Sequence, residues 1–267
     1  MEDKIVKDNI KINDINIHYK LQGLENEKTI VFIHGLSDDL NYWSKLEYNF
    51  SKEYKTLSYD LRGHGKSDLA NNEVSVELIT SDIMKLLEKL DIDKFNLIGF
   101  SLGGSIAINI AEKYPERVNK LVLLSTFAKA DSTIENYFKE FNNCLNKSFS
   151  EYYDYILEYV LPEDLIEKHQ ESLEEIKVAK SKTVCCENLI KVLPVGLKFD
   201  GEKDLDKITA LTLIISSKHD ELTKTELSHT KVREKEIENN VDVIIKDHII
   251  DTFNEYLYAT RQFDGLN

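Results

Sequence analysis

One short segment of this chain holds the residue types best suited to covalent chemistry. Residues 99–104 read GFSLGG, at the point where an apolar run (95–99) changes into a helix-like pattern (102–113). Glycines two positions either side of Ser101 permit a tight turn between strand and helix. Such a turn exposes the serine hydroxyl beside the backbone N–H of Leu102 and the positive end of the helix. Ser101 is therefore a candidate nucleophile, although glycine-rich turns of this kind also occur where they only pack.

A nucleophilic serine needs a second backbone donor for the negative oxygen of a tetrahedral intermediate. The run 31–35 reads as a strand that ends in His34 and Gly35. Gly35 allows the backbone to turn so that the N–H of Leu36 faces the same cavity as the N–H of Leu102. We expect His34 to shape this loop through a hydrogen bond rather than to act as the base.

The serine also needs a base, and the base needs a carboxylate to orient it. Asp220 is the first carboxylate after the apolar run 211–217, and His248 follows the last such run, 241–245. Both would lie at the carboxyl ends of strands, where open α/β sheets place their ligands. The resulting chain order is Ser, Asp, His, and His64 and His219 remain rival bases.

The elements that must position these residues show as apolar and β-branched runs separated by helical stretches. Most runs are continuously apolar, as in strands covered by helices on both faces. The first run alternates around residues 13–14 instead, which predicts an antiparallel hairpin at the sheet edge. The expected strands fall at 10–19, 29–33, 55–59, 95–99, 120–125, 211–216 and 241–245.

No strand-like apolar run appears between about residues 127 and 207, where apolar residues recur at helical spacing instead. Two helices are predicted over 134–145 and 152–159, a third opens at Pro162, and a fourth ends at Pro194. No Gly/Ser/Pro-rich linker flanks this block. It therefore reads as a helical insertion between two strands of the sheet. Its aromatic side chains are expected to pack more than to line a pocket.

Composition excludes several classes of partner. The 267 residues carry a net charge of −14 with no compensating basic patch, which argues against nucleic acid and anionic membranes as partners. No apolar run is long enough for a membrane span or a signal peptide, so a cytoplasmic protein with a small-molecule substrate is expected. The three cysteines fit a reducing compartment and core packing. Oligomeric state cannot be derived from these features.

The chain resembles the α/β-hydrolase superfamily over residues 10–126 and 211–263. The motifs are the serine turn at 99–104, the FIHG run at 32–35, the DLRGHGKSD run at 60–68, and the late Asp220 and His248. The resemblance implies a mostly parallel sheet of about eight strands, with helices on both faces and an all-helical cap after the sixth strand. The predicted domains are a core of residues 1–127 and 206–267 and a cap of residues 128–205.

The resemblance also assigns roles. Ser101 becomes the nucleophile, His248 the base, Asp220 its orienting acid, and the N–H groups of Leu36 and Leu102 the oxyanion hole. This chemistry requires neither a metal nor an organic cofactor, and a serine at the nucleophile position excludes the aspartate-based branch of the superfamily. The chain departs from the usual pattern at two positions, with Ser217 and Asp247 where glycine is common.

The expected reaction is hydrolysis of a small carboxylic ester through an acyl-enzyme. Thioesterase, lactonase, carbon–carbon hydrolase and lyase reactions use the same architecture and remain alternatives. A non-catalytic receptor or signalling adaptor is the alternative from another class, and it would be favoured if Asp247 disabled His248. The loop 60–68 is expected to be structural, with Asp60 and Arg62 bonding locally, and Trp43 is expected to anchor the core.

Overall fold

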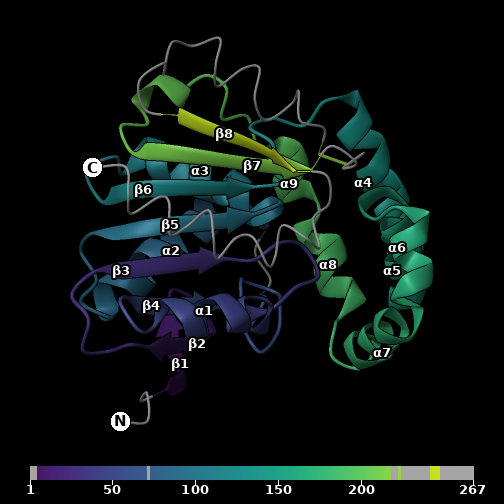
Figure 1. Ribbon diagram of the computed structural model, residues 1–267, viewed down its shortest axis with the longest axis horizontal. Coiled ribbons are helices and arrows are strands. Elements are labelled where there is room, and N and C mark those ends of the chain that lie inside the picture. The colour runs from purple at the N-terminus through teal and green to yellow at the C-terminus, as the bar shows by residue number, and fades with distance from the viewer. Residues whose placement is uncertain (1–4, 71–72, 218–221, 224–240, 247–267) are drawn as a thin grey trace.

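The structure is a computed structural model that describes residues 5–70, 73–217, 222–223 and 241–246 (Figure 1). Within these ranges the backbone forms one sheet of eight strands in the order β1-β2-β4-β3-β5-β6-β7-β8. The first two neighbouring pairs are antiparallel, and all the others are parallel. The strands are β1 (Val6–Ile12), β2 (Ile15–Gln22), β3 (Thr29–Ile33), β4 (Lys55–Tyr59), β5 (Phe95–Phe100), β6 (Val118–Leu124), β7 (Leu211–Ser217) and β8 (Val241–Lys246).

The predicted fold class and the hairpin at the sheet edge are both confirmed. Strands β1 and β2 pair from Val6 opposite Leu21 to Ile12 opposite Ile15, and Asn13 in the turn between them has a φ of 51°. Asparagine adopts this left-handed conformation more readily than most residues, which suits it to the turn. Periodicity located all seven predicted strand regions. The first region contains two strands, β1 and β2.

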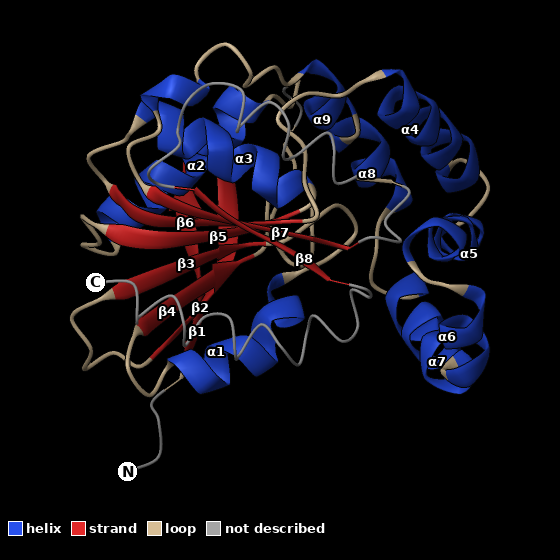
Figure 2. Cartoon of the chain, turned by 45° about the horizontal axis from the view of Figure 1, so that its top comes forward, coloured by secondary structure: helices blue, strands red, loops and turns tan. Residues whose placement is uncertain are grey.

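Helices cover both faces of the sheet. Figure 2 shows α2 (Val76–Lys89) and α3 (Leu102–Lys113) on one face and α1 (Ser44–Phe50) on the other. All five residues of β3 are buried, as its position between two layers requires. Trp43, in the short 3₁₀ helix η1 (Leu40–Trp43), is 1% exposed and packs against Phe32 with ring centroids 5.2 Å apart. Trp43 is thus the core anchor that the sequence predicted.

Six helices occupy the stretch between β6 and β7, where the helical insertion was predicted. We call α4–α9 the helical segment. It lies beyond the carboxyl ends of the parallel strands (Figure 1). Its helices are α4 (Ser132–Leu145), α5 (Phe149–Val160), α6 (Glu163–Lys168), α7 (Gln170–Ser181), α8 (Cys186–Val192) and α9 (Pro194–Lys198), followed by the 3₁₀ helix η2 (Leu205–Lys207). The domain boundaries at 128 and 205 stay a prediction.

Local chemistry explains where these helices begin. The carboxylate of Asp131 accepts a hydrogen bond from the N–H of Ile134, and the hydroxyl of Ser148 accepts one from the N–H of Glu151. Pro162 precedes α6, as predicted. The predicted fourth helix is α8, which ends at Val192 before Pro194, but Pro194 also opens α9, a further short helix that was not predicted. The sequence reading missed α7 because this helix has no buried residue and therefore no apolar stripe.

Two further expectations from the sequence concern the burial of the cysteines and membrane-spanning helices. Cys144 is buried and Cys186 partly buried, but Cys185 is exposed, so core packing was wrong for Cys185. Cys185 is the residue that directly precedes the first turn of α8. None of the helices in the described ranges is both long and apolar enough to cross a bilayer.

Candidate active site

Ser101 lies at the turn between β5 and α3 in a conformation that serine seldom adopts. Its φ and ψ are 51° and −120°. Its backbone N–H donates to the carbonyl of Leu124 at 2.9 Å, and its carbonyl accepts from the N–H of Gly104 at 2.9 Å and the hydroxyl of Thr126 at 2.6 Å. Strained backbone of this kind persists only where the surroundings determine it fully. The neighbouring elements therefore hold Ser101 in place.

The glycines around Ser101 are required by close approach of backbone to backbone. A Cβ at Gly99 would lie 2.5 Å from the carbonyl oxygen of Gly103. A Cβ at Gly103 would lie 2.3 Å from the carbonyl oxygen of Ile33 and 2.5 Å from that of His34. The turn that carries Ser101 thus rests directly against the end of β3, where the predicted second oxyanion donor begins.

His34 fixes the loop after β3. Its Nε2 accepts a hydrogen bond from the backbone N–H of Leu61 at 3.0 Å, so its Nδ1 carries the proton and donates to the carbonyl of Gly35 at 2.8 Å. Complete burial lowers the pKa of His34 to about 4, which keeps the ring neutral. The structure confirms that His34 shapes the loop through hydrogen bonds.

Asp60 joins this loop to the segment 60–68. One carboxylate oxygen accepts the N–H of Leu40 at 2.8 Å, and the other accepts the N–H of Lys66 at 2.8 Å. Gly65 has a φ of 51°, and a Cβ there would meet the Asp60 carboxylate at 2.3 Å. Asp60 therefore acts structurally, as predicted, although it ties together two loops rather than one.

Arg62 and His64 are also structural. The guanidinium of Arg62 binds Asp82 at 2.8 Å and Asp14 at 2.7 Å. These partners are 20 and 48 residues away, so the expectation of local bonding was too narrow for Arg62. The ring of His64 is buried 5.1 Å from that of His34, and burial lowers its pKa to about 3. Neither His34 nor His64 is among the described residues that line the cavity beside Ser101, which argues against either of them as the base.

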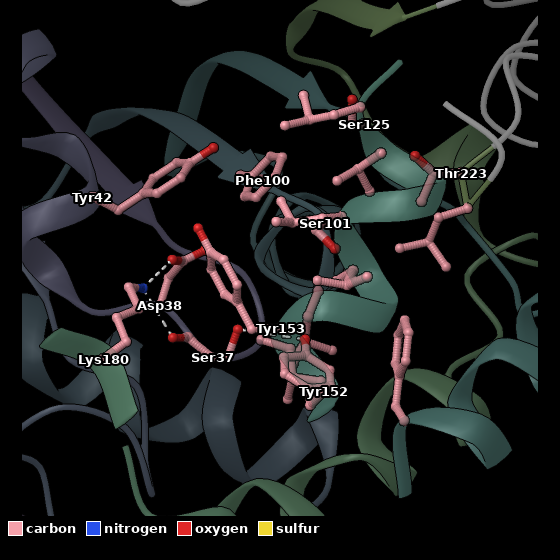
Figure 3. Close-up of a pocket in the computed structure, with 18 of the residues that line it drawn as sticks. Ser37, Asp38, Tyr42, Phe100, Ser101, Ser125, Tyr152, Tyr153, Lys180 and Thr223 are labelled. Atoms are coloured by element: carbon pink, nitrogen blue, oxygen red, sulfur yellow. Dashed lines mark hydrogen bonds and ion pairs between the residues drawn. The ribbon is translucent and has the colours of Figure 1, made fainter. Parts of the chain in front are cut away.

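Ser101, Leu36 and Leu102 all border one cavity of about 510 Å³. Figure 3 labels Ser101 among the residues that line it. Across the described ranges, no hydrogen-bond acceptor is found for the backbone N–H of Leu36 or of Leu102. A serine and two unpaired N–H groups on one cavity can provide a nucleophile and a pair of donors for an oxyanion. Leu36 was predicted to meet Ser101 and Leu102, which lie 65 and 66 positions further along the chain, and all three border this cavity.

The cavity lies between the core and the helical segment. One wall belongs to the core and includes the loop after β3 and the Ser101 turn, and the opposite wall is mostly apolar and comes mainly from α4, α5 and α7. The helical wall consists of Ile134, Phe138, Phe141, Tyr152, Tyr153, Ile156, Leu157, Val160, Leu161, Ile176 and Lys180. Aromatic residues here both pack and line the cavity, so the expectation that they would mainly pack described only part of their role.

Asp220, His248 and the rival base His219 lie outside the described residues, as does Asp247. The structure does describe the strands that precede them. Strands β7 and β8 are parallel neighbours, so their carboxyl ends lie at the same edge of the sheet as the end of β5. Leu222 and Thr223 also border the cavity. The roles of Asp220 and His248 stay predictions.

The sequence analysis missed a polar cluster on the rim of the cavity. The ammonium of Lys180 on α7 binds the carboxylate of Asp38 at 2.5 Å and the carbonyl of Ser37 at 3.0 Å (Figure 3). The hydroxyl of Ser37 donates to that of Tyr152 at 3.4 Å. Burial raises the pKa of Asp38 above its ordinary value, although Lys180 opposes this shift. No local pattern signals the cluster, because Lys180 and Asp38 are 142 residues apart.

A metal-dependent mechanism has no candidate site in the part of the chain that the structure describes. No three histidine, cysteine, aspartate or glutamate side chains gather there in an arrangement that could hold an ion.

Comparison with known proteins adds evidence on the fold. Residues 28–161 match the family model described as alpha/beta hydrolase fold. The crystal structure of MGS-M2, an alpha/beta hydrolase enzyme from a Medee basin deep-sea metagenome library, superposes with a TM-score of 0.87 at 23% identity, covering 97% of this chain and 98% of that one.

Two curated proteins illustrate the range of similar sequences. The 3-oxoadipate enol-lactonase 2 of Acinetobacter baylyi is 28% identical over 123 residues, which cover 46% of each chain. Epoxide hydrolase 4 of Mus musculus is 33% identical over 118 residues, 43% of this chain and 33% of that protein. The similarity thus spans less than half the length of these curated relatives.

Proposed function

This chain belongs to the α/β-hydrolase family, and we propose that it is a serine hydrolase with Ser101 as its nucleophile. The observation that carries the proposal is that Ser101, in its strained turn, borders one cavity together with Leu36 and Leu102, whose backbone N–H groups have no acceptor among the described residues. In this proposal the two N–H groups serve as donors that are already fixed before the reaction. Such preorganised donors stabilise negative charge that develops only in the transition state.

The proposed reaction has two halves. His248, oriented by Asp220, removes the proton from Ser101 as the hydroxyl oxygen attacks the ester carbonyl. The N–H groups of Leu36 and Leu102 hold the resulting oxyanion. The intermediate collapses, the C–O bond to the alcohol breaks, and the alcohol leaves with the proton from His248. Water, activated by the same histidine, then attacks the acyl-enzyme, and the acid and free Ser101 are restored.

Chain order and sheet topology support Asp220 and His248 in these roles. Asp220 follows the end of β7 by three residues, and His248 follows the end of β8 by two. Both strands run parallel to β5, whose end carries Ser101. Short connections from these strand ends can therefore bring an acid and a base to the edge of the sheet that holds the serine.

The walls of the cavity favour a small neutral ester with an apolar acyl group. Most of the lining is aliphatic or aromatic, which favours the burial of hydrocarbon. Asp38 and Asp39 supply carboxylates on the core side, and Lys180 is already bound to Asp38. Anionic substrates would meet these carboxylates, so we propose that a carboxylic ester without further negative charge is preferred.

A lactone is the second candidate substrate. The similarity to a protein named as an enol-lactonase supports it, because a lactone is a cyclic ester that the same nucleophile and oxyanion donors would open. The apolar lining again favours lactones without a free carboxylate. Rates on neutral lactones and on open-chain esters of equal carbon number would decide between the two classes.

Replacement of Ser101 tests the proposal directly. Ser101→Ala should lower the hydrolysis of 4-nitrophenyl esters by at least about 10³-fold, and by up to about 10⁶-fold, because no nucleophile remains. A fluorophosphonate probe should label the wild type and Ser125→Ala, which removes another serine at the cavity, but not Ser101→Ala. Labelling should also fail in His248→Ala.

Two results would contradict this assignment. Ester hydrolysis at the wild-type rate in a folded Ser101→Ala variant would remove Ser101 as the nucleophile. Tight ligand binding by the wild type with neither turnover nor labelling would instead support the receptor alternative.

A further inference from the structure

We propose that Lys180 is a positioning residue for the oxyanion hole, through which helix α7 acts on the reaction. The inference rests on the proposed function and concerns the loop that carries the N–H of Leu36. Lys180 contacts the two residues that follow Leu36 and does not need to touch the substrate. Its role would be to hold the donor in place and to neutralise a carboxylate beside it.

The geometry of the contact is specific. Lys180 lies in the last turn of α7, and its ammonium reaches the Ser37 carbonyl at 3.0 Å and the Asp38 carboxylate at 2.5 Å. The two side chains of the ion pair are 24% and 16% exposed, so solvent screens the pair only in part. Figure 3 shows both bonds on the side of the cavity opposite Thr223.

The loop needs such support because its backbone is strained and irregular. Ser37 has a φ of 66°, in the left-handed region that serine rarely occupies. Within the loop, the N–H of Asp38 donates to the carbonyl of Gly35 at 3.4 Å, which is a long hydrogen bond. The backbone φ and ψ angles of Leu36 and Ser37 set the direction of the Leu36 N–H relative to the Ser37 carbonyl, which Lys180 binds. A bond that fixes this carbonyl therefore restricts the rotation of the donor.

The ion pair also matters for charge. Asp38 borders the same cavity as Ser101, and a carboxylate there would repel the negative oxygen of the intermediate. Lys180 places a positive charge directly on this carboxylate. Loss of the ammonium would leave the carboxylate uncompensated and the loop less restrained, and both effects raise the energy of the transition state more than that of the bound ester.

Helix α7 offers a matched control one turn away. Lys177 forms ion pairs with Asp154 on α5 and with Glu174 on α7 itself. Within the described ranges, both hydrogen bonds from α7 to the loop after β3 come from Lys180. Lys177→Met and Lys180→Met therefore make the same chemical change on the same helix, but only the second removes a bond to the oxyanion loop.

The experiment compares these variants on a short 4-nitrophenyl ester. Lys180→Met should lower kcat about 10- to 100-fold with KM within about threefold of the wild type, because only the transition state carries the oxyanion. Lys177→Met should stay within about twofold in both constants. Lys180→Arg should recover most of kcat, since a guanidinium can donate to both the carbonyl and the carboxylate.

A second measurement separates positioning from general damage. An alkylboronic acid forms a tetrahedral anionic adduct with the serine, so it should bind Lys180→Met at least 10-fold more weakly than the wild type. A neutral apolar fluorophore in the same cavity should bind both proteins equally. Adding Asp38→Asn to Lys180→Met should raise kcat several-fold, because the uncompensated carboxylate is gone.

Each contrary result has a defined meaning. An unchanged kcat in folded Lys180→Met, or an equal loss in Lys177→Met, overturns the role of Lys180. A loss confined to KM makes Lys180 a substrate contact instead. Should Lys180→Met not fold, a kcat in Lys180→Arg as low as that of Ser101→Ala overturns the proposal as well. Absence of fluorophosphonate labelling at Ser101 in the wild type overturns the proposed function, and the positioning role with it.

Discussion

The two walls of the cavity are built by different physical means. The core wall is fixed by backbone: the Ser101 turn rests on glycines with no room for a Cβ, and buried polar groups such as His34 and Asp60 hold the loops beside it. The helical wall is fixed by side-chain packing. Phe141 contacts Phe138 and Tyr152 with ring centroids 5.5 and 5.3 Å apart.

The two kinds of contact suit two different tasks, the positioning of reacting groups and the accommodation of the acyl group. Backbone contacts and buried hydrogen bonds position atoms to within a few tenths of an ångström, which suits groups that take part in a reaction. Aromatic and aliphatic packing tolerates exchange of one apolar side chain for another of similar volume. We therefore expect the core wall to determine the chemistry and the helical wall to determine which acyl group fits.

Two glycines test the comparison most sharply, Gly103 in the turn behind the core wall and Gly196 on α9, which packs against Phe138 of the helical wall. Gly103→Ala should cost about 3 kcal/mol or more in the free energy of unfolding, because its Cβ would overlap the backbone oxygens of Ile33 and His34, which cannot move independently of the sheet. Gly196→Ala on α9 should change it by about 1 kcal/mol or less. There the nearest atoms to the Cβ would belong to the rings of Phe138 and Phe127, at 3.1 and 3.3 Å, and alanine favours a helix.

Urea unfolding and ester hydrolysis of the two glycine variants provide the measurement. Equal stability losses would show that the two walls are equally rigid, contrary to the distinction drawn here.

Buried His64, whose ring lies against that of His34 in the core, makes the stability of the fold depend on pH. Burial lowers the pKa of His64 to about 3, whereas in the unfolded chain it titrates near the usual 6.5. Between these values the unfolded state binds the proton and the folded state does not, so the free energy of unfolding falls as pH falls from 6.5 towards 3. One such group contributes a slope of up to about 1.4 kcal/mol per pH unit.

His64→Asn keeps a donor for the Arg62 carbonyl, which the His64 Nδ1 contacts at 3.1 Å, and removes the titration. Urea unfolding between pH 6 and 4.5 should then show a slope lower than the wild type by about 1 kcal/mol per pH unit. Above pH 7.5 the two stability curves should run parallel. Identical slopes at low pH would show that His64 is not held neutral by the fold.

Substitutions in the helical wall should change the preference for acyl-chain length rather than stability or turnover. Leu157 on α5 borders the cavity, and Leu157→Phe would displace the far end of a long acyl chain. Each displaced methylene costs about 0.8 kcal/mol of burial, or about fourfold in kcat/KM. The acetyl ester should be hydrolysed as by the wild type, and the octanoyl ester several-fold more slowly.

Glu158→Phe, at the exposed neighbouring position, adds similar bulk outside the cavity and serves as the control. Uniform loss across all chain lengths in Leu157→Phe would place Leu157 near the reacting atoms instead of in an acyl pocket.

The sequence alone was sufficient for the parts of this protein that depend on local stereochemistry. Period-two and continuous apolar runs located the strands, and glycine spacing located the Ser101 turn, because only glycine tolerates the backbone contacts found there. The same reasoning paired Leu36 with Leu102, since parallel strands place their carboxyl ends at one edge of a sheet. The polar helix α7 was missed, because helical periodicity is visible only where one face is buried.

Other features were decided by the tertiary structure. The guanidinium of Arg62 binds the carboxylates of Asp14 and Asp82. The ammonium of Lys180 binds Ser37 and Asp38, and in both cases the partners are far apart in the sequence. Charged residues are common throughout the sequence, and no periodic pattern indicates which of them will form an ion pair. Steric limits of the backbone act within a few residues and can be derived from their order, whereas an ion pair depends on where two distant elements dock.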